Sequence, residues 1–143
     1  MRFQRRYWLF ERLGWAVLIL VIAAAAAGIF AGGPLSAAAA GGAAVSAEYE
    51  RFARRGVDTR LTVTLSAHGT LRVQGADGFD VAAVEPRPAA VRSDRGGLAY
   101  DFATGDGTTT VTFRLTPRRW GMQHLRLAAD AGAPATLDIL VYP

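Results

Sequence analysis

The hydrophobic and polar positions of this 143-residue chain follow two different patterns along its length. Leu13 to Ala31 is a run of 19 residues without a charge. As a helix this run is about 28 Å long, close to the hydrocarbon thickness of a bilayer. From Glu48 onward, apolar residues instead alternate with polar ones, with the period of two that is typical of half-buried strands. The sequence therefore predicts one membrane-spanning helix followed by a small β domain.

The alternation is clearest over Thr59–Leu65, where β-branched residues dominate. Turn-forming pairs such as Asp77-Gly78 and Gly96-Gly97 separate similar stretches at intervals of roughly ten residues. We therefore expect an all-β domain over residues 48–143, an antiparallel β-sandwich of the immunoglobulin-like type with about seven or eight strands. The other predicted strands hold Leu71 and Val73; Phe79 to Val84; Leu98, Tyr100 and Phe102; Val111, Phe113 and Leu115; Leu125 and Leu127; and Leu137, Ile139 and Val141.

The stretch from Val45 to Phe52 fits two structures. Val45, Ala47 and Tyr49 alternate with polar residues, which favours a first strand, whereas Tyr49 and Phe52 are spaced as on one helical turn. We favour an edge strand that leads out of the tether.

The arginines indicate the orientation of the predicted span. Four of them, Arg2, Arg5, Arg6 and Arg12, precede it, and the next basic residue is Arg51. By the positive-inside tendency, the flank 1–12 stays in the cytoplasm, 13–32 crosses the membrane, and the rest is extracytoplasmic. Residues 33–47 are small and uncharged, which predicts a flexible tether that spans roughly 20 Å.

A cleaved signal is the alternative to a retained anchor. Gln4 to Leu9 is similar to a twin-arginine export motif, and Val45-Ser46-Ala47 has the form of a cleavage site. The apolar run is longer than the core of a typical signal peptide, so we favour the anchor.

Small residues line one face of the predicted span. Ala24, Gly28 and Gly32 are four residues apart, and Gly28 to Gly32 is a G-x-x-x-G motif that permits close approach of another helix. This pattern is compatible with helix packing or a weak homo-oligomer, although the alanine run Ala23–Ala27 produces such spacings by itself.

Composition narrows the chemistry that the chain can perform. It has no Cys and no Lys, which excludes disulfides, thiol nucleophiles and lysine-dependent catalysis. Residues 48–143 hold twelve Arg and eleven Asp or Glu, a balance that argues against nucleic-acid binding. His68, His124 and Ser66 lack the surroundings of a metal site or a catalytic triad. We expect no enzyme activity, no metal and no cofactor.

The loop Pro117–Gly121 is the most distinctive feature of the β domain. Arg118 and Arg119 precede Trp120, and Arg and Trp are enriched at binding hot spots. Such a loop suits contact with a protein partner or with lipid headgroups, or it is a tight turn whose Trp packs back onto the sandwich.

Several short motifs resemble a group of bacterial single-pass inner-membrane proteins to which no activity is assigned. They are Arg5 to Trp15, Gly32 to Ser36, Glu48 to Phe52 and the terminal Val141-Tyr142-Pro143. The resemblance implies an N-terminal anchor and a small outer β domain, and it carries no functional residues. Such proteins are often encoded beside a multi-pass membrane protein, which implies a partner of that kind.

Two functions therefore remain open. The first is a membrane-tethered interaction module, an accessory or adaptor subunit of another inner-membrane or envelope protein. The alternative is a periplasmic module that binds a ligand or polysaccharide. A flat apolar patch near the tether would favour the first, and a concave patch with exposed aromatic rings would favour the second.

Overall fold

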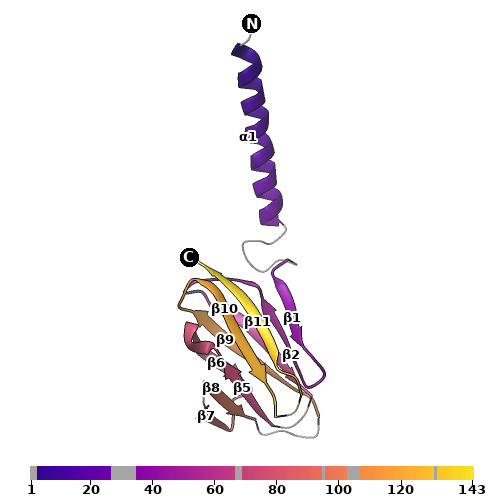
Figure 1. Ribbon diagram of the computed structural model, residues 1–143, viewed down its shortest axis with the longest axis vertical. Helices are drawn as coiled ribbons and strands as arrows, with labels where there is room; N and C mark the ends of the chain where they lie inside the picture. The colour runs from indigo at the N-terminus through magenta and orange to yellow at the C-terminus, as the bar shows by residue number, and fades with distance from the viewer. Residues whose placement is uncertain (1–2, 27–34, 67–68, 95, 103–106, 131) are drawn as a thin grey trace. The chain divides into compact units, whose positions relative to one another are not determined.

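The chain divides into two compact units, Met1–Ser36 and Ala37–Pro143. The computed structural model describes residues 3–26, 35–66, 69–94, 96–102, 107–130 and 132–143. The first unit contains the helix α1, Phe3–Ala26, and the second unit contains all the strands (Figure 1).

The helix α1 begins ten residues before the predicted span, within the basic flank. Among the described residues, no helix combines the length and the apolar character that crossing a membrane requires. The predicted span 13–32 continues beyond Ala26 into residues 27–32, which lie outside the described part of the chain.

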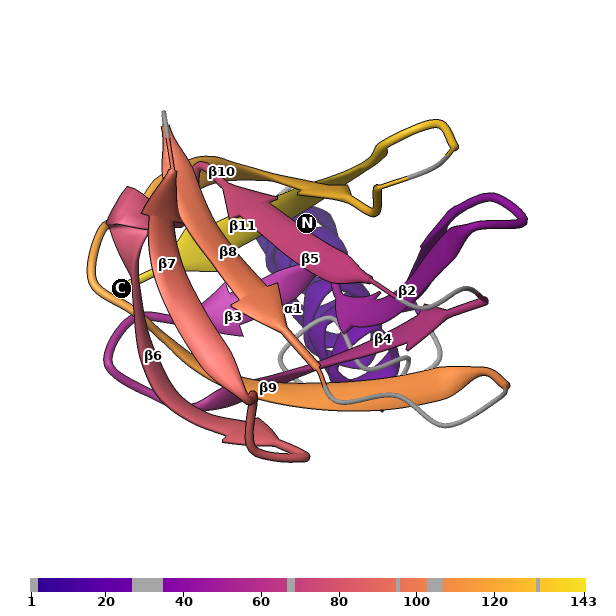
Figure 2. The ribbon, with the colours of Figure 1, turned by 90° about the horizontal axis from the view of Figure 1, so that it is seen from below.

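The second unit consists of two sheets. The five-stranded sheet has the order β1-β2-β4-β9-β6, and the six-stranded sheet has the order β3-β11-β10-β5-β8-β7. Figure 2 shows them as opposing layers, with β10, β5 and β8 across from β2, β4 and β9. The strands are β1 (Ala37–Gly41), β2 (Val45–Glu50), β3 (Phe52–Arg54), β4 (Thr59–Leu65), β5 (Thr70–Gln74), β6 (Phe79–Glu85), β7 (Ala90–Asp94), β8 (Gly97–Asp101), β9 (Thr109–Pro117), β10 (Gly121–Ala128) and β11 (Ala135–Tyr142), with a 3-10 turn, η1 (Ala76–Gly78), before β6.

The core lies between the two sheets and is built from the alternating residues that the sequence singles out. In β4, for example, Leu61, Val63 and Leu65 are buried, whereas the residues between them face outward. The ring of Tyr100 from one sheet packs edge-on against that of Phe113 from the other, with centroids 5.3 Å apart. The prediction of an all-β fold with two packed sheets is confirmed.

Four details of the prediction are wrong. The described residues form eleven strands rather than about seven or eight, because short strands such as β1 and β7 are held by backbone pairing and lack an alternating apolar pattern. The predicted tether 33–47 is not a tether from Ala37 onward, because Ala37–Gly41 forms β1 and pairs with β2. The segment Val45–Phe52 is not an edge strand, because β2 lies between β1 and β4, and the chain then crosses to the other sheet as β3. The sandwich is not wholly antiparallel, because β3 runs parallel to β11.

Candidate interaction surface

Two turns that are far apart in the sequence lie side by side at one end of the sandwich. The first links β3 to β4 and is closed by a hydrogen bond from the Val57 amide to the Arg54 carbonyl, 3.2 Å. The second links β9 to β10. The amide of Gly56 in the first turn donates to the carbonyl of Pro117 in the second, 2.9 Å. This bond fixes the two turns as neighbours.

The ends of both turns are tied to the rest of the sandwich. The Arg55 amide donates to the Tyr142 carbonyl at the end of β11, and the Arg118 amide donates to the Gly78 carbonyl of η1, each at 2.8 Å. The Thr116 hydroxyl also donates to Asp58, 2.5 Å. Their backbones are therefore positioned by the fold before any partner binds.

These two turns carry the same kind of side chains. Each presents two arginines followed, directly or after a glycine, by an exposed apolar residue. We call the surface the basic end, and it consists of Arg54, Arg55, Val57, Arg118, Arg119 and Trp120. The sequence predicts Arg118, Arg119 and Trp120 as a contact loop, and the structure places all three on the exposed surface. It adds Arg54, Arg55 and Val57, which the sequence analysis missed.

The charges of the basic end are mostly uncompensated. Arg118 forms an ion pair with Asp80. Among the residues that the structure describes, Arg54, Arg55 and Arg119 have no ion-pair partner. The basic end therefore carries positive charge that is available to an anionic partner.

Apolar groups are also exposed here. Trp120 is 71% exposed and Val57 is 50% exposed. The alternative in which Trp120 packs back over the sandwich edge does not fit this exposure. A large exposed aromatic residue beside unpaired arginines is the composition of a binding surface.

A second exposed feature lies on the outer face of the six-stranded sheet. Phe52, Leu140 and Met122 stand opposite one another on β3, β11 and β10, and they form what we call the apolar row. Leu140 is 40% exposed, Met122 is 54% exposed and Phe52 is half-buried. Because neighbouring strands present these side chains on one sheet face, they form one continuous apolar surface.

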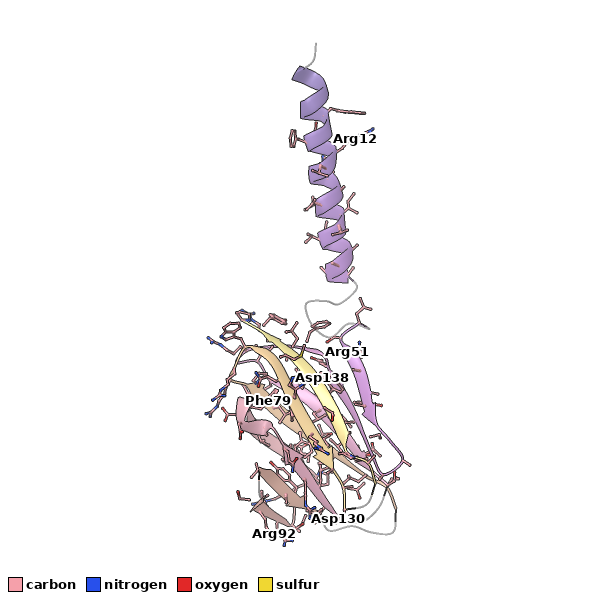
Figure 3. The ribbon with its side chains drawn as sticks, viewed as in Figure 1. Arg12, Arg51, Phe79, Arg92, Asp130 and Asp138 are labelled. Atoms are coloured by element: carbon pink, nitrogen blue, oxygen red, sulfur yellow. The ribbon has the colours of Figure 1, made fainter. Side chains whose placement is uncertain are left out.

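The chain enters the sandwich at the same end. Ala37, the first residue of β1, pairs with Glu50, and the carbonyl of the next residue, Arg51, accepts a hydrogen bond from the Leu140 amide. Figure 3 shows Arg51 at this end and Arg92 and Asp130 at the opposite end of the sandwich. The basic end and the apolar row are thus close to the point where the chain arrives from the first unit.

The opposite end contains a polar cluster that holds the β7 edge. Asp101 accepts hydrogen bonds from Arg92 Nε, 2.9 Å, and from the Thr70 hydroxyl, 2.7 Å. These bonds, first that of Arg92 and then that of Thr70, lower the pKa of the Asp101 carboxyl. Because every group already has a partner, the cluster is structural.

A cleft of about 550 Å³ lies on the outer face of the five-stranded sheet. Arg60 of β4 and Arg114 of β9 stand directly opposite each other in it, and so do Thr62 and Thr112 in the next row. Neither arginine forms an ion pair with the described residues. The cleft therefore offers two cations and two hydroxyls to solvent, beside the carboxylates of Asp58 and Glu85 that also line it.

We expect Arg114→Thr to raise the free energy of unfolding by up to about 1 kcal/mol, because like charges directly opposite each other on neighbouring strands are destabilising. The gain should shrink in high salt, which screens exposed charges. Urea denaturation at low and high salt measures both effects. Arg126→Thr is the control, because Arg126 faces Thr136 and Gln74 rather than a cation. Equal changes for the two variants would contradict the repulsion.

The predicted residues of the first unit are only partly described. Arg12 is exposed, and its guanidinium lies 3.6 Å from the centroid of the Trp8 ring. Arg5 and Arg6 fall within α1, whereas Arg2 lies outside the described residues. Of the small-residue face, Ala24 is half-buried in α1, and Gly28 and Gly32 lie outside the described residues.

The histidines show no metal-binding arrangement in the described part of the chain. His124 is exposed, as its strand position predicts, and its Nδ1 lies 2.6 Å from Asp138 Oδ1 on the neighbouring strand. His68 lies outside the described residues. Over residues 3–26, 35–66, 69–94, 96–102, 107–130 and 132–143, no three His, Asp or Glu side chains gather as metal ligands.

The chain matches no protein-family model, and a comparison with curated proteins finds no match either.

Proposed function

We propose that this protein is a membrane-tethered interaction module, an accessory or adaptor subunit of another envelope membrane protein. In this proposal the N-terminus lies in the cytoplasm of a bacterium, the segment 13–32 is a single-pass anchor, and an immunoglobulin-like sandwich lies outside the inner membrane. The uncharged run Leu13–Ala31 and the concentration of arginines before it support the anchor.

The apolar row is the observation on which this proposal rests. Three apolar side chains side by side on one sheet face, close to the point where the chain enters the domain, suit a protein partner that is held in the same membrane. A partner that covers Leu140 and Met122 would remove their apolar surface from water, which favours association. The small-residue face Ala24, Gly28 and Gly32 would supply a second contact within the bilayer.

A ligand- or polysaccharide-binding module is the second candidate, and the polar cleft supports it. Arg60 and Arg114 could bind a carboxylate together, and the hydroxyls of Thr62 and Thr112 could bind sugar hydroxyls. Among the described residues that line the cleft, the one aromatic residue is Phe113, whose ring is buried and therefore not available to stack against a sugar. We therefore place the adaptor function first.

Cross-linking followed by affinity purification of the full-length chain from carbonate-washed membranes tests the proposal. The wild-type chain should stay in the washed membranes and recover a specific membrane protein. Met122→Asp with Leu140→Asp should reduce that recovery at least about tenfold, because a charge would be buried against the partner.

Val91→Asp is the matched control, because Val91 is also an exposed apolar residue, 52% exposed, on the far edge strand β7 of the same sheet. It should recover the partner as the wild type does. Equal recovery by the Met122/Leu140 variant would overturn the role of the apolar row. Binding of an acidic polysaccharide that depends on Arg60 and Arg114 would instead favour the second candidate.

A further inference from the structure

The basic end projects from the sandwich as two adjacent turns, whereas the apolar row lies on a sheet face. The turn from Arg54 to Val57 and the turn from Arg118 to Trp120 are joined by the hydrogen bond between Gly56 and Pro117. Four arginines and two exposed apolar residues therefore share one small surface, and its backbone is fixed by the fold.

This composition fits the boundary between lipid headgroups and acyl chains. Trp is enriched at that boundary because its ring is apolar while its N–H can hydrogen-bond. Trp120 and Val57 are the exposed apolar members of the basic end, at 71% and 50% exposure. Arginines beside them can bind phosphate while their apolar stems lie along the membrane surface.

A protein partner fits this surface less well. Arginine and tryptophan are also common in protein interfaces, but a surface that combines four arginines with a single tryptophan requires a protein partner to present several carboxylates together. Three of these arginines have no ion-pair partner among the described residues. An extended anionic surface compensates all of them at once.

The length of the chain makes contact with a bilayer feasible. Ten residues, 27–36, separate the last residue of α1 from the first residue of β1. Even fully extended, this stretch spans at most about 40 Å. It enters the sandwich at the end that carries the two turns. A membrane that holds the N-terminal segment is therefore within reach of the basic end.

We propose that the basic end docks on anionic phospholipid headgroups, with Arg54, Arg55 and Arg119 on phosphate groups and Trp120 and Val57 inserted at the headgroup boundary. This inference rests on the membrane tether of the proposed function. In that arrangement the end of the sandwich rests on the membrane, and the apolar row faces sideways, toward a neighbouring membrane protein.

The fluorescence of Trp120 can be used to measure docking on the bilayer. The chain has three tryptophans, so Trp8→Phe with Trp15→Phe leaves Trp120 as the only one. This full-length chain is reconstituted into vesicles of phosphatidylcholine with brominated acyl chains, either pure or mixed with an equal part of phosphatidylglycerol. Trp120 fluorescence should be quenched strongly in the mixed vesicles and weakly in the pure ones, and salt should reverse the difference.

The charge dependence separates docking from accidental proximity. Each arginine near an anionic surface contributes about fivefold to binding, so Arg54→Gln with Arg55→Gln and Arg119→Gln should weaken docking about a hundredfold. The matched control is Arg72→Gln with Arg87→Gln and Arg126→Gln, which removes the same charge from exposed positions away from the two turns. The control should leave the quenching of Trp120 unchanged.

The remaining outcomes each overturn the docking proposal in a recognisable way. Quenching that is equal in the two vesicles, or equally reduced by both triple variants, would exclude specific docking. Competition by soluble glycerol phosphate at low concentration would indicate a site for a free phosphate rather than a bilayer surface. A chain that stays in carbonate-washed vesicles with Trp120 unquenched would overturn the docking alone, whereas a chain released by the wash would overturn the tether.

Discussion

Replacing Phe113 by Ala is expected to lower the free energy of unfolding by about 3–5 kcal/mol, the usual cost of removing a buried ring. Phe113 is 1% exposed and lies on β9, where its ring meets that of Tyr100 on the opposite sheet. The loss combines transfer of the ring to water, a cavity between the sheets and the edge-on ring contact. Chemical denaturation of the purified chain, followed by circular dichroism, measures it.

Thr110→Ala is the control for this experiment, because Thr110 lies on the same strand but faces outward. It should cost less than about 1 kcal/mol, the span of strand propensities. A loss below about 1 kcal/mol for Phe113→Ala would mean that the ring is not in the core, since burial is what makes the substitution costly.

The strands in which apolar and polar residues alternate could be predicted, because each has one buried face. In β4, β9 and β11, the apolar residues recur every second position and contribute to the core, so the pattern and the structure have the same cause. The predicted strand Thr59–Leu65 coincides with β4.

The strands that were missed lack this signature. β1 consists of four alanines and a glycine, and it is a strand because its backbone pairs with β2. β7 forms the edge of its sheet, and its only large apolar residue, Val91, is exposed. Backbone pairing at an edge does not require an apolar pattern, so neither strand can be recognised from hydrophobic periodicity.

Only one of the two turns that form the basic end could be predicted from the sequence. The loop with Arg118, Arg119 and Trp120 stands out because Trp is rare in the β domain. The turn Arg54-Arg55-Gly56-Val57 has the same arrangement of charge. It is recognised as part of a binding surface only when it is seen beside the turn with Trp120. That neighbour is some 60 residues away in sequence, and the antiparallel pairing of β4 with β9 brings the two together, because it places the start of β4 beside the end of β9.

The basic end is formed mainly by two turns and the apolar row by three strands of one sheet, so the two surfaces can bind different partners. In the function that we propose, the membrane would orient the sandwich and the apolar row would bind a protein in that membrane. Two weak contacts suffice in such an arrangement, because the first raises the effective concentration for the second. Loss of either contact should therefore weaken the assembly without unfolding the domain.

Gly75→Ala is expected to lower the free energy of unfolding by about 3 kcal/mol through two separate costs. Gly75 links β5 to η1 with a φ of 78°, and a Cβ there would lie 2.3 Å from the His124 carbonyl oxygen of β10. The left-handed backbone costs an alanine roughly 1–2 kcal/mol. The rest of the loss in free energy arises because the β10 backbone must move away from β5. No flexible side chain can give way instead.

Gly56→Ala separates these two costs. Gly56 has nearly the same φ, 75°, but nothing lies within 4 Å of the position that its Cβ would occupy. Urea denaturation of both variants should therefore give a loss of only about 1 kcal/mol for Gly56→Ala, which reflects the backbone conformation alone. The excess loss at Gly75 measures how rigidly β5 and β10 are held together. Equal losses would show instead that the sheet yields at this junction at no cost, which would contradict the close packing of the two strands around Gly75.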